Sequence, residues 1–159
     1  MIKLDSTDLK ILAVLQKQGR ITKAALAEKV NLTPTPCWER LNRLEKAGII
    51  EGYETRLSVK KLGPLTVVFM AAEIENHRGD DFRRFETAIG RIDEITGCWA
   101  VGGGIDYLLR IVTRDIEAYQ QLVDELLAME IGLIRYYSYV MTKSVKQGPD
   151  IPLSLIGPS

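Results

Sequence analysis

The sequence predicts an α+β protein in two parts, an N-terminal winged helix-turn-helix followed by a C-terminal ferredoxin-like βαββαβ domain. Three observations predict this class. Residues 4–48 contain three consecutive helical patterns, and residues 65–142 alternate strand-like and helix-like runs. The two parts also differ in net charge. Residues 1–62 hold twelve Lys and Arg against seven Asp and Glu, a net charge of +5, and residues 63–159 hold nine against fourteen, a net charge of −5. A basic half is the electrostatic footprint of a nucleic-acid surface.

Residues that start and stop helices bound the first two helical patterns. Asp5 is placed as the N-cap of the first, with Asp8 three residues on, and Gly19 ends it. Thr22 caps a short, alanine-rich second helix, ITKAALAEKV. Asn31 follows, and Asn tolerates the left-handed conformation that a tight turn between helices requires. A third helix follows this turn, so the second and third helices have the spacing of a helix-turn-helix.

The third helix starts with two prolines, in LTPTPCWERLNRLEKAGII at residues 32–50. With Thr33 as the N-cap, Pro34 takes the first helical position and Pro36 the third, where backbone N–H groups have no intrahelical acceptor. The prolines therefore cost no helical hydrogen bond and make the helix start rigid. The positive end of the helix dipole, with the hydroxyls of Thr33 and Thr35, is placed to meet an anion such as a phosphate.

The third helix has an apolar and a polar face. Cys37, Leu41 and Leu44 fall at i, i+4 and i+7 and are predicted to face inward. Arg and Asn can make bidentate contacts with guanine and adenine edges, and an apolar ring can lie against a thymine methyl. Such a mixed face is most often only solvated, and its Trp could equally pack on a neighbouring helix or subunit. The helix-turn-helix spacing, the basic half and the cap favour DNA. The outward residues are Thr35, Trp38, Glu39, Asn42 and Arg43, flanked by Arg40 and Lys46.

Residues 49–58, IIEGYETRLS, have the strand composition and central glycine of a short wing or hairpin. Arg56, Lys60 and Lys61 nearby are expected to touch phosphates. The predicted boundaries are residues 1–59 for the winged helix-turn-helix domain, 60–64 (KKLGP) for a linker, 65–146 for the second domain and 147–159 for a tail.

The second half reads as strand, helix, strand, strand, helix, strand. The runs are LTVVFMAAEIE, GDDFRRFETAIGRI after an Asp cap, EITGCWAVGG, IDYLLRIVT, RDIEAYQQLVDELLAM and LIRYYSYVMT. In a ferredoxin-like sheet the two helices cover one face, so apolar residues on the other face need a partner surface. Dimerisation through the sheets is the economical solution.

No residue pattern indicates an enzyme. The one histidine, His77, lies in the loop-like NHRGD without Cys or His at ligand spacing, so neither a metal nor a cofactor is expected. The glycines at 102–104 lack the order of a Rossmann or phosphate-binding loop. Cys37 and Cys98 read as buried free thiols. No base, nucleophile and orienting group come together in the sequence.

The stretch Gly102-Gly103-Gly104-Ile105-Asp106-Tyr107 admits two interpretations. The residues alone favour a hairpin turn, in which glycines supply positive φ and Asp106 caps its own backbone. Glycines also let backbone N–H groups approach a carboxylate, and an adjacent Asp can accept from an α-ammonium, which together would make an amino-acid site.

No apolar run approaches the roughly 18 residues that a membrane span needs, and the N-terminus lacks the apolar core of a signal peptide. A cytoplasmic location without a membrane partner is therefore expected.

The sequence resembles the Lrp/AsnC family, the leucine-responsive or feast/famine regulators. The resemblance rests on LDSTDLKILAVLQKQGRIT, LTPTPCWERLNRLEKAGIIEGY and GGGIDYLLRI, and it runs in one register over residues 2–146. Three features depart from the family pattern. Asn31 stands where Gly is common, the triple glycine replaces one Gly followed by a polar or acidic residue, and GPDIPLSLIGPS extends past the usual end.

The resemblance implies a sequence-specific DNA-binding transcriptional regulator whose DNA affinity or oligomeric state responds to an amino acid or related metabolite. It implies a homodimer that assembles into tetramers or octamers and binds double-stranded DNA at a roughly palindromic operator. The residues expected to contact DNA are Thr33, Thr35, Trp38, Glu39, Arg40, Asn42, Arg43 and Arg56. In the family, the glycine loop and the facing final strand line an effector pocket between dimers, which maps onto Gly102, Gly103, Gly104, Asp106, Tyr107, Tyr139, Val140 and Met141.

Two alternatives stay open. A nucleoid-type architectural protein would bind DNA with little sequence preference. A metabolic enzyme or amino-acid-binding module would use the second domain alone and would have no affinity for DNA.

Overall fold

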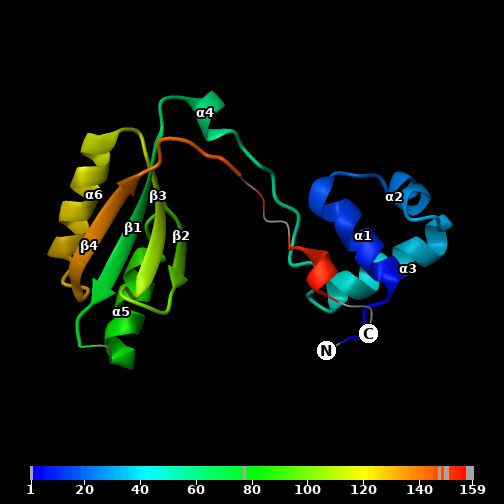
Figure 1. The fold of residues 1–159 in the computed structure, drawn as a ribbon, viewed down its shortest axis with the longest axis horizontal. Helices are drawn as coiled ribbons and strands as arrows, with labels where there is room; N and C mark the ends of the chain where they lie inside the picture. Colours follow the sequence, from blue (N-terminus) through cyan, green and yellow to red (C-terminus); the bar gives the residue numbers. More distant parts are fainter. Residues whose placement is uncertain (1, 77, 147, 149–150, 157–159) are drawn as a thin grey trace. The chain divides into compact units, whose positions relative to one another are not determined.

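The computed structural model describes residues 2–76, 78–146, 148 and 151–156 (Figure 1). The contacts divide the chain into two compact units. The first holds the residues up to Arg56 together with those from Lys146 onward, and the second holds Leu57–Val145. The chain therefore passes from one unit to the other twice. A short helix, α4 (Val59–Leu62), lies across most of the segment predicted as a linker. His77 lies outside the described residues.

The first unit contains three helices in the predicted order, α1 (Ser6–Lys17), α2 (Lys23–Lys29) and α3 (Pro34–Lys46). Asp5 is the N-cap of α1, and its side chain and that of Asp8 complete a reciprocal capping box, as predicted. One apolar cluster joins the three helices, and its buried members are Ile11, Leu12, Leu26, Ala27, Val30, Cys37, Leu41 and Leu44.

Hydrogen-bonded left-handed turns end both α2 and α3. Asn31 has φ 56°, and the Leu32 N–H donates to the carbonyl of Ala27 at 2.9 Å. Gly48 has φ 68°, and the Ile49 N–H donates to the carbonyl of Leu44 at 3.1 Å. Both are Schellman motifs, which satisfy carbonyls at the helix end that would otherwise lack donors. The first sets the turn of the helix-turn-helix, as the sequence predicted for Asn31.

The segment after α3 does not form the predicted hairpin. Residues 51–58 contain no strand, and all of them are exposed. The Tyr53 hydroxyl donates to Glu45 Oε1 at 2.8 Å and so ties this segment back to α3. Strand composition alone was misleading here, because residues 51–58 bury no face that would hold two strands together.

The second unit is a four-stranded antiparallel sheet with two long helices, in the predicted element order (Figure 1). The spatial order is β2-β3-β1-β4, that of a ferredoxin-like sheet. The elements are β1 (Thr66–Ile74), α5 (Gly79–Ile89), β2 (Ile95–Ala100), β3 (Tyr107–Thr113), α6 (Ile116–Ala128) and β4 (Leu133–Val140). The predicted Asp cap of α5 is wrong: Arg78 is the N-cap, and Asp80 and Asp81 lie in the first turn.

The two faces of the sheet differ. Alternate residues of β1, including Met70 and Ile74, pack with α5 and α6 in one core. The strand register puts Phe69 opposite Tyr139, and Ala71 opposite both Tyr137 and Leu108, on the other face. We call this second side the open face. Three aromatic side chains on it are about half exposed: Trp99 (50%), Tyr137 (46%) and Tyr139 (59%).

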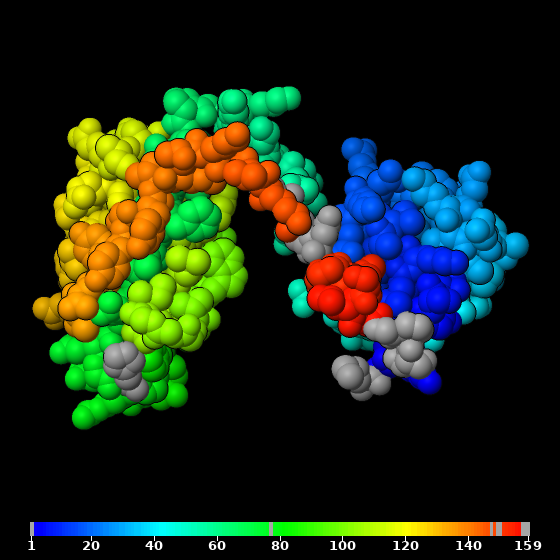
Figure 2. All heavy atoms as spheres, viewed as in Figure 1, coloured from blue at the N-terminus to red at the C-terminus, as the bar shows by residue number. Residues whose placement is uncertain are grey.

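Residues 151–156, which we call the C-terminal arm, belong to the first unit. The Ile151 N–H donates to Gln16 Oε1 at 2.7 Å, and Gln16 Nε2 donates to the Ile151 carbonyl at 3.2 Å. Leu153, in a short 3-10 turn (Leu153–Leu155), packs against the helical core. Figure 2 shows this segment in red against the blue surface of the first unit.

Candidate functional site

Helix α3 turns its predicted apolar side inward and its polar side outward. Cys37, Leu41 and Leu44 are buried in the first unit's core. Most of the outward residues stand at the surface, with Asn42 and Arg40 half-buried: the exposed ones are Thr33, Thr35, Trp38, Glu39 and Arg43. Arg56, after the helix, is also exposed. The chain's own first unit therefore leaves this face open to a ligand.

The start of α3 has the predicted geometry. Thr33 is the N-cap, with extended backbone, and Pro34 and Pro36 occupy the first turn. The Thr33 side chain makes no capping hydrogen bond to the helix. Its hydroxyl is therefore not engaged in holding the helix together, and it stands at the positive end of the helix dipole.

Trp38 has a cationic neighbour that the sequence analysis missed. Lys23 Nζ lies 3.0 Å from the centroid of the Trp38 ring. Lys23 is the first residue of α2, so this cation–π contact joins the two helices of the helix-turn-helix at their outer side. Only an assumed helix-turn-helix geometry could have paired the two residues, because they are fifteen positions apart in the chain.

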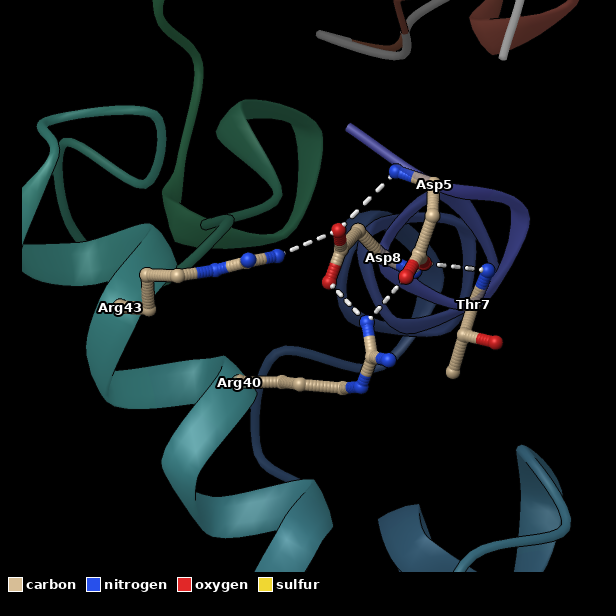
Figure 3. Close-up of polar contacts among 5 residues, drawn as sticks. All are labelled: Asp5, Thr7, Asp8, Arg40 and Arg43. Carbon is tan, nitrogen blue, oxygen red and sulfur yellow. Dashed lines mark hydrogen bonds and ion pairs between the residues drawn. The ribbon is translucent and has the colours of Figure 1, made fainter. Parts of the chain in front are cut away.

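The two arginines of α3 bind carboxylates at the start of α1 (Figure 3). Arg43 Nη2 lies 2.5 Å from Asp8 Oδ2. Arg40 Nη1 bridges Asp5 Oδ2 at 2.6 Å and Asp8 Oδ1 at 2.9 Å. We call these four residues the Asp/Arg cluster. Asp8 is fully buried, whereas the side chains of Arg40 and Arg43 keep 31% and 47% exposure. Both arginines were expected to contact DNA. In the structure, one nitrogen of each guanidinium is already bound to a carboxylate of α1 or its N-cap.

The Asp/Arg cluster is built on the capping box. Asp5 Oδ1 accepts from the backbone N–H groups of Thr7 and Asp8, both at 2.8 Å, and Asp8 Oδ2 accepts from the Asp5 N–H at 3.0 Å. The Asp8 N–H, followed by the Arg40 guanidinium, lowers the pKa of Asp5 to about 2. Both interactions favour the ionised carboxylate.

The glycine loop between β2 and β3 is anchored by Asp106. Asp106 Oδ2 accepts from the Ile74 N–H at 2.7 Å, and the Asp106 N–H donates to the Ala72 carbonyl at 2.9 Å. Of the three glycines, Gly103 has a positive φ, 137°. A Cβ at Gly102 or Gly104 would meet open space. Asp106 therefore connects its loop to the end of β1, which is distant in sequence. The turn interpretation had expected Asp106 to cap its own loop.

Tyr107 lies in the core beneath this loop. It is 4% exposed, and its ring centroid is 4.9 Å from that of Phe85. Its hydroxyl donates to Glu86 Oε1 at 2.6 Å. Burial, then the Glu86 carboxylate, raises the pKa of the Tyr107 phenol. Within one chain, Tyr107 has almost no surface left for a ligand.

The predicted effector residues fall at two ends of the sheet. Asp106 binds the Ile74 end of β1, whereas Tyr139 pairs with Phe69 and the Met141 N–H donates to the Val67 carbonyl. Ile74 is seven residue steps along the strand from Val67, or about 23 Å at the usual rise per residue. One chain therefore does not bring the glycine loop and the end of β4 into a single pocket.

The part of the chain that the structure describes holds no cluster of three or more His, Cys, Asp or Glu side chains placed to bind a metal ion. Within the same ranges, every helix is too short or too polar to span a bilayer.

Comparison with known families and proteins matches both units. Residues 4–51 match a winged helix-turn-helix DNA-binding family, and residues 67–151 match the Lrp/AsnC ligand binding domain. The transcriptional regulatory protein DoeX of Halomonas elongata is 47% identical over 154 residues, which cover 97% of each chain. The chain belongs to the Lrp/AsnC family. The leucine-responsive regulatory protein of Escherichia coli K12 is 40% identical over 144 residues, covering 91% of this chain and 88% of that protein.

Solved structures of Lrp/AsnC relatives share the fold. A transcriptional regulator from Neisseria meningitidis, crystallised in complex with L-Met, superposes with a TM-score of 0.90 at 34% identity, covering 96% of this chain and 99% of that one. An AsnC family regulator from Agrobacterium tumefaciens gives a TM-score of 0.89 at 30% identity, with coverage of 96% and 99%. This protein is therefore a transcriptional regulator with a DNA-binding and a ligand-binding domain, and not an enzyme. The predicted fold class is confirmed.

Proposed function

We propose that this regulator binds specific DNA sites through α3 and that an amino acid or related metabolite changes its DNA affinity or its state of assembly. The observation that carries the proposal is the open outer face of α3, opposite the buried Cys37, Leu41 and Leu44. Trp38, Asn42 and Arg43 on that face supply an apolar ring and two side chains able to form bidentate contacts with bases.

The remaining DNA contacts are assigned by position. Thr33 and Thr35 at the rigid start of α3 bind phosphate, as does Arg56 after the helix. Glu39 and Arg40 flank the central contacts. Phosphate contacts set the position of the protein on the duplex, and base contacts select the sequence.

Two observations support the effector proposal: the ligands of relatives, and the separation of the predicted effector residues at the two ends of β1. Among relatives, one protein is named for its response to leucine and another was crystallised with L-Met. Because Tyr139, Val140 and Met141 lie at the far end of β1 from Asp106, a site that includes both sets needs a second copy of the chain. A pocket between dimers meets that requirement, and binding there would be linked directly to assembly.

The open face supports dimerisation through the sheets. Trp99, Tyr137 and Tyr139 leave aromatic surface in water, which a two-fold related copy would cover. Further assembly into tetramers or octamers would place glycine loops and β4 ends of different dimers together. In this scheme residues 1–59 form the DNA-binding domain, 60–64 the linker, 65–146 the effector and assembly domain, and 147–159 a tail.

The experiment is a titration of two fluorescent duplexes, one selected by the protein from a random library and one random, at several salt concentrations. Sequence-specific binding predicts a selected duplex bound at least about a thousandfold more tightly. Arg43→Ala should reduce this ratio, and Lys60→Ala should weaken both duplexes alike, since a phosphate contact carries no sequence information. A protein that binds both duplexes equally is an architectural protein, and one that binds neither contradicts the proposal.

The ligand is tested by thermal unfolding with single amino acids, starting with L-Leu and L-Met. A ligand that binds the folded state raises the melting temperature. The proposal also requires that the same amino acid shift either the DNA affinity or the sedimentation profile, because the coupling is reciprocal. An amino acid that binds and changes neither property would remove the regulatory part of the proposal.

A further inference from the structure

The Asp/Arg cluster has a feature that the DNA contacts alone do not explain. Its central carboxylate, Asp8, lies in α1 and is fully buried, so Asp8 itself offers no surface to DNA. It accepts from Arg40, Arg43 and the Asp5 N–H, so both of its oxygens are satisfied. A buried carboxylate requires such partners, but the partners here are the two arginines of the outer face of α3.

We infer that Asp8 is a positioning residue for DNA recognition, which holds the Arg43 guanidinium by one edge and leaves its other edge aimed for a bidentate contact with a base. This inference rests on the proposed function. The contact with Asp8 engages Nη2, one of the three guanidinium nitrogens, and 47% of the Arg43 side chain is exposed. An arginine carries five N–H donors in a planar fork, so a clamp on one edge fixes the direction of the rest.

The cluster also weakens the attraction of its arginines to DNA phosphates. Two carboxylates, Asp5 and Asp8, face two guanidiniums, Arg40 and Arg43, so the cluster has no net charge. An unpaired arginine would be free to follow any phosphate, which strengthens binding to all sequences. The cluster restrains both arginines and so lowers nonspecific attraction while preserving base contacts. Asp5 restrains Arg40 alone, so its effect on nonspecific binding should be smaller than that of Asp8.

Replacing Asp8 therefore predicts opposite changes for two duplexes. Asp8→Asn removes the charge at nearly constant volume and releases Arg43. Affinity for a random duplex should stay equal or rise, and the slope of log K against log salt should steepen by about 0.9 for one new phosphate contact. The preference for the selected duplex should fall at least about tenfold, as expected when one bidentate contact loses its geometry. A purely structural role would instead lower both affinities together, through the folded fraction.

Three controls isolate the effect. Asp80→Asn makes the same charge change in an exposed ion pair with Arg83 on α5, in the other unit, and should leave the preference and the salt slope unchanged. In the presence of Arg43→Gln, adding Asp8→Asn should cause no further loss of preference, because Asp8 acts on base contacts through Arg43. If circular dichroism shows Asp8→Asn unfolded, Asp8→Glu replaces it; this variant keeps the charge but displaces the guanidinium, and it should lose preference with an unchanged salt slope.

The measurements separate this inference from the proposed function. If the wild-type chain shows no preference between the two duplexes, the proposed function fails and the inference fails with it. If the wild-type chain is selective and the folded Asp8 variant is equally selective, or loses affinity for both duplexes in the same proportion, the inference alone is overturned. A reduced preference with undiminished nonspecific affinity supports it.

Discussion

A charge placed on the open face of the sheet should break the proposed dimer. We choose Tyr137→Glu because Tyr137 lies on that face, opposite Ala71 of β1, and 46% of its surface remains in water. A tyrosine buries about 150–250 Å² when fully covered, so the exposed part is on the order of 100 Å². At about 25 cal/mol per Å², covering it contributes about 2 kcal/mol.

Two-fold symmetry doubles this contribution. Each substitution occurs once in each protomer, so losing both rings costs about 4 kcal/mol, which corresponds to a roughly thousandfold weaker dimer. Desolvation of the two glutamates adds to this cost. Sedimentation equilibrium over a range of concentrations measures the change.

The control is Thr87→Glu, which adds the same charge at an exposed position of α5, on the helix-covered side of the sheet. It lies four residues from both Arg83 and Arg91, where a glutamate is tolerated on a helix. It should leave the dimer intact. A Tyr137→Glu protein that dimerises as tightly as the wild type, with unchanged circular dichroism, would refute dimerisation through the open face.

Three smaller predictions follow from the first unit. The lowered pKa of Asp5, about 2 against 3.8, stabilises the fold fully above pH 4 and is lost as the pH falls towards 2; Asp5→Asn, which keeps a capping oxygen, should flatten this part of a denaturant-measured stability profile. Because Asp5 is exposed, the effect should stay below about 1 kcal/mol. An unaltered profile would show that neither the Asp8 N–H nor the Arg40 guanidinium stabilises the fold through the Asp5 charge. Gly48→Ala places a side chain at φ 68° and should cost about 1 kcal/mol in urea unfolding; a neutral result would mean the turn relaxes. Removing residues 149–159 deletes the C-terminal arm and should lower the melting temperature of the first unit by several degrees. An unchanged melting temperature after truncation would contradict this prediction.

Local patterns were sufficient to predict much of the fold. The position of Pro34 and Pro36 after Thr33 follows from the orphan N–H groups of a helix start, and the structure places all three as expected. Asn31 takes the left-handed conformation predicted for the turn. The alternation of strands and helices in the second half gave the element order, because each element carries its own periodicity.

Contacts between distant residues were beyond those patterns. Arg43 and Asp8 are 35 positions apart, and Gln16 and Ile151 are 135 apart, so no spacing rule connects them. The sequence assigned Arg43 wholly to DNA, and the structure shows that it is also bound to α1. Asp106 was likewise predicted to act on its own loop or on a ligand, and the structure shows that it also accepts from the N–H of Ile74.

The two predicted sites differ in how far one chain can complete them. The residues proposed to contact DNA all lie in the first unit, on α3, at its N-cap Thr33 and at Arg56 in the segment after it. The effector residues fall at opposite ends of β1, since the strand register fixes their separation and the sequence alone does not give that register. The proposed effector site would be completed only by a second copy of the chain, which no single-chain pattern encodes.

The central claim is that the outer face of α3 enters the major groove. Methylation protection with dimethyl sulfate tests it directly, because the reagent attacks guanine N7 in that groove. On the selected duplex we expect protected guanines in two half-sites about one helical turn, or a multiple, apart, and loss of that protection in Arg43→Ala. Tight binding that leaves every guanine N7 as reactive as in free DNA would contradict the account.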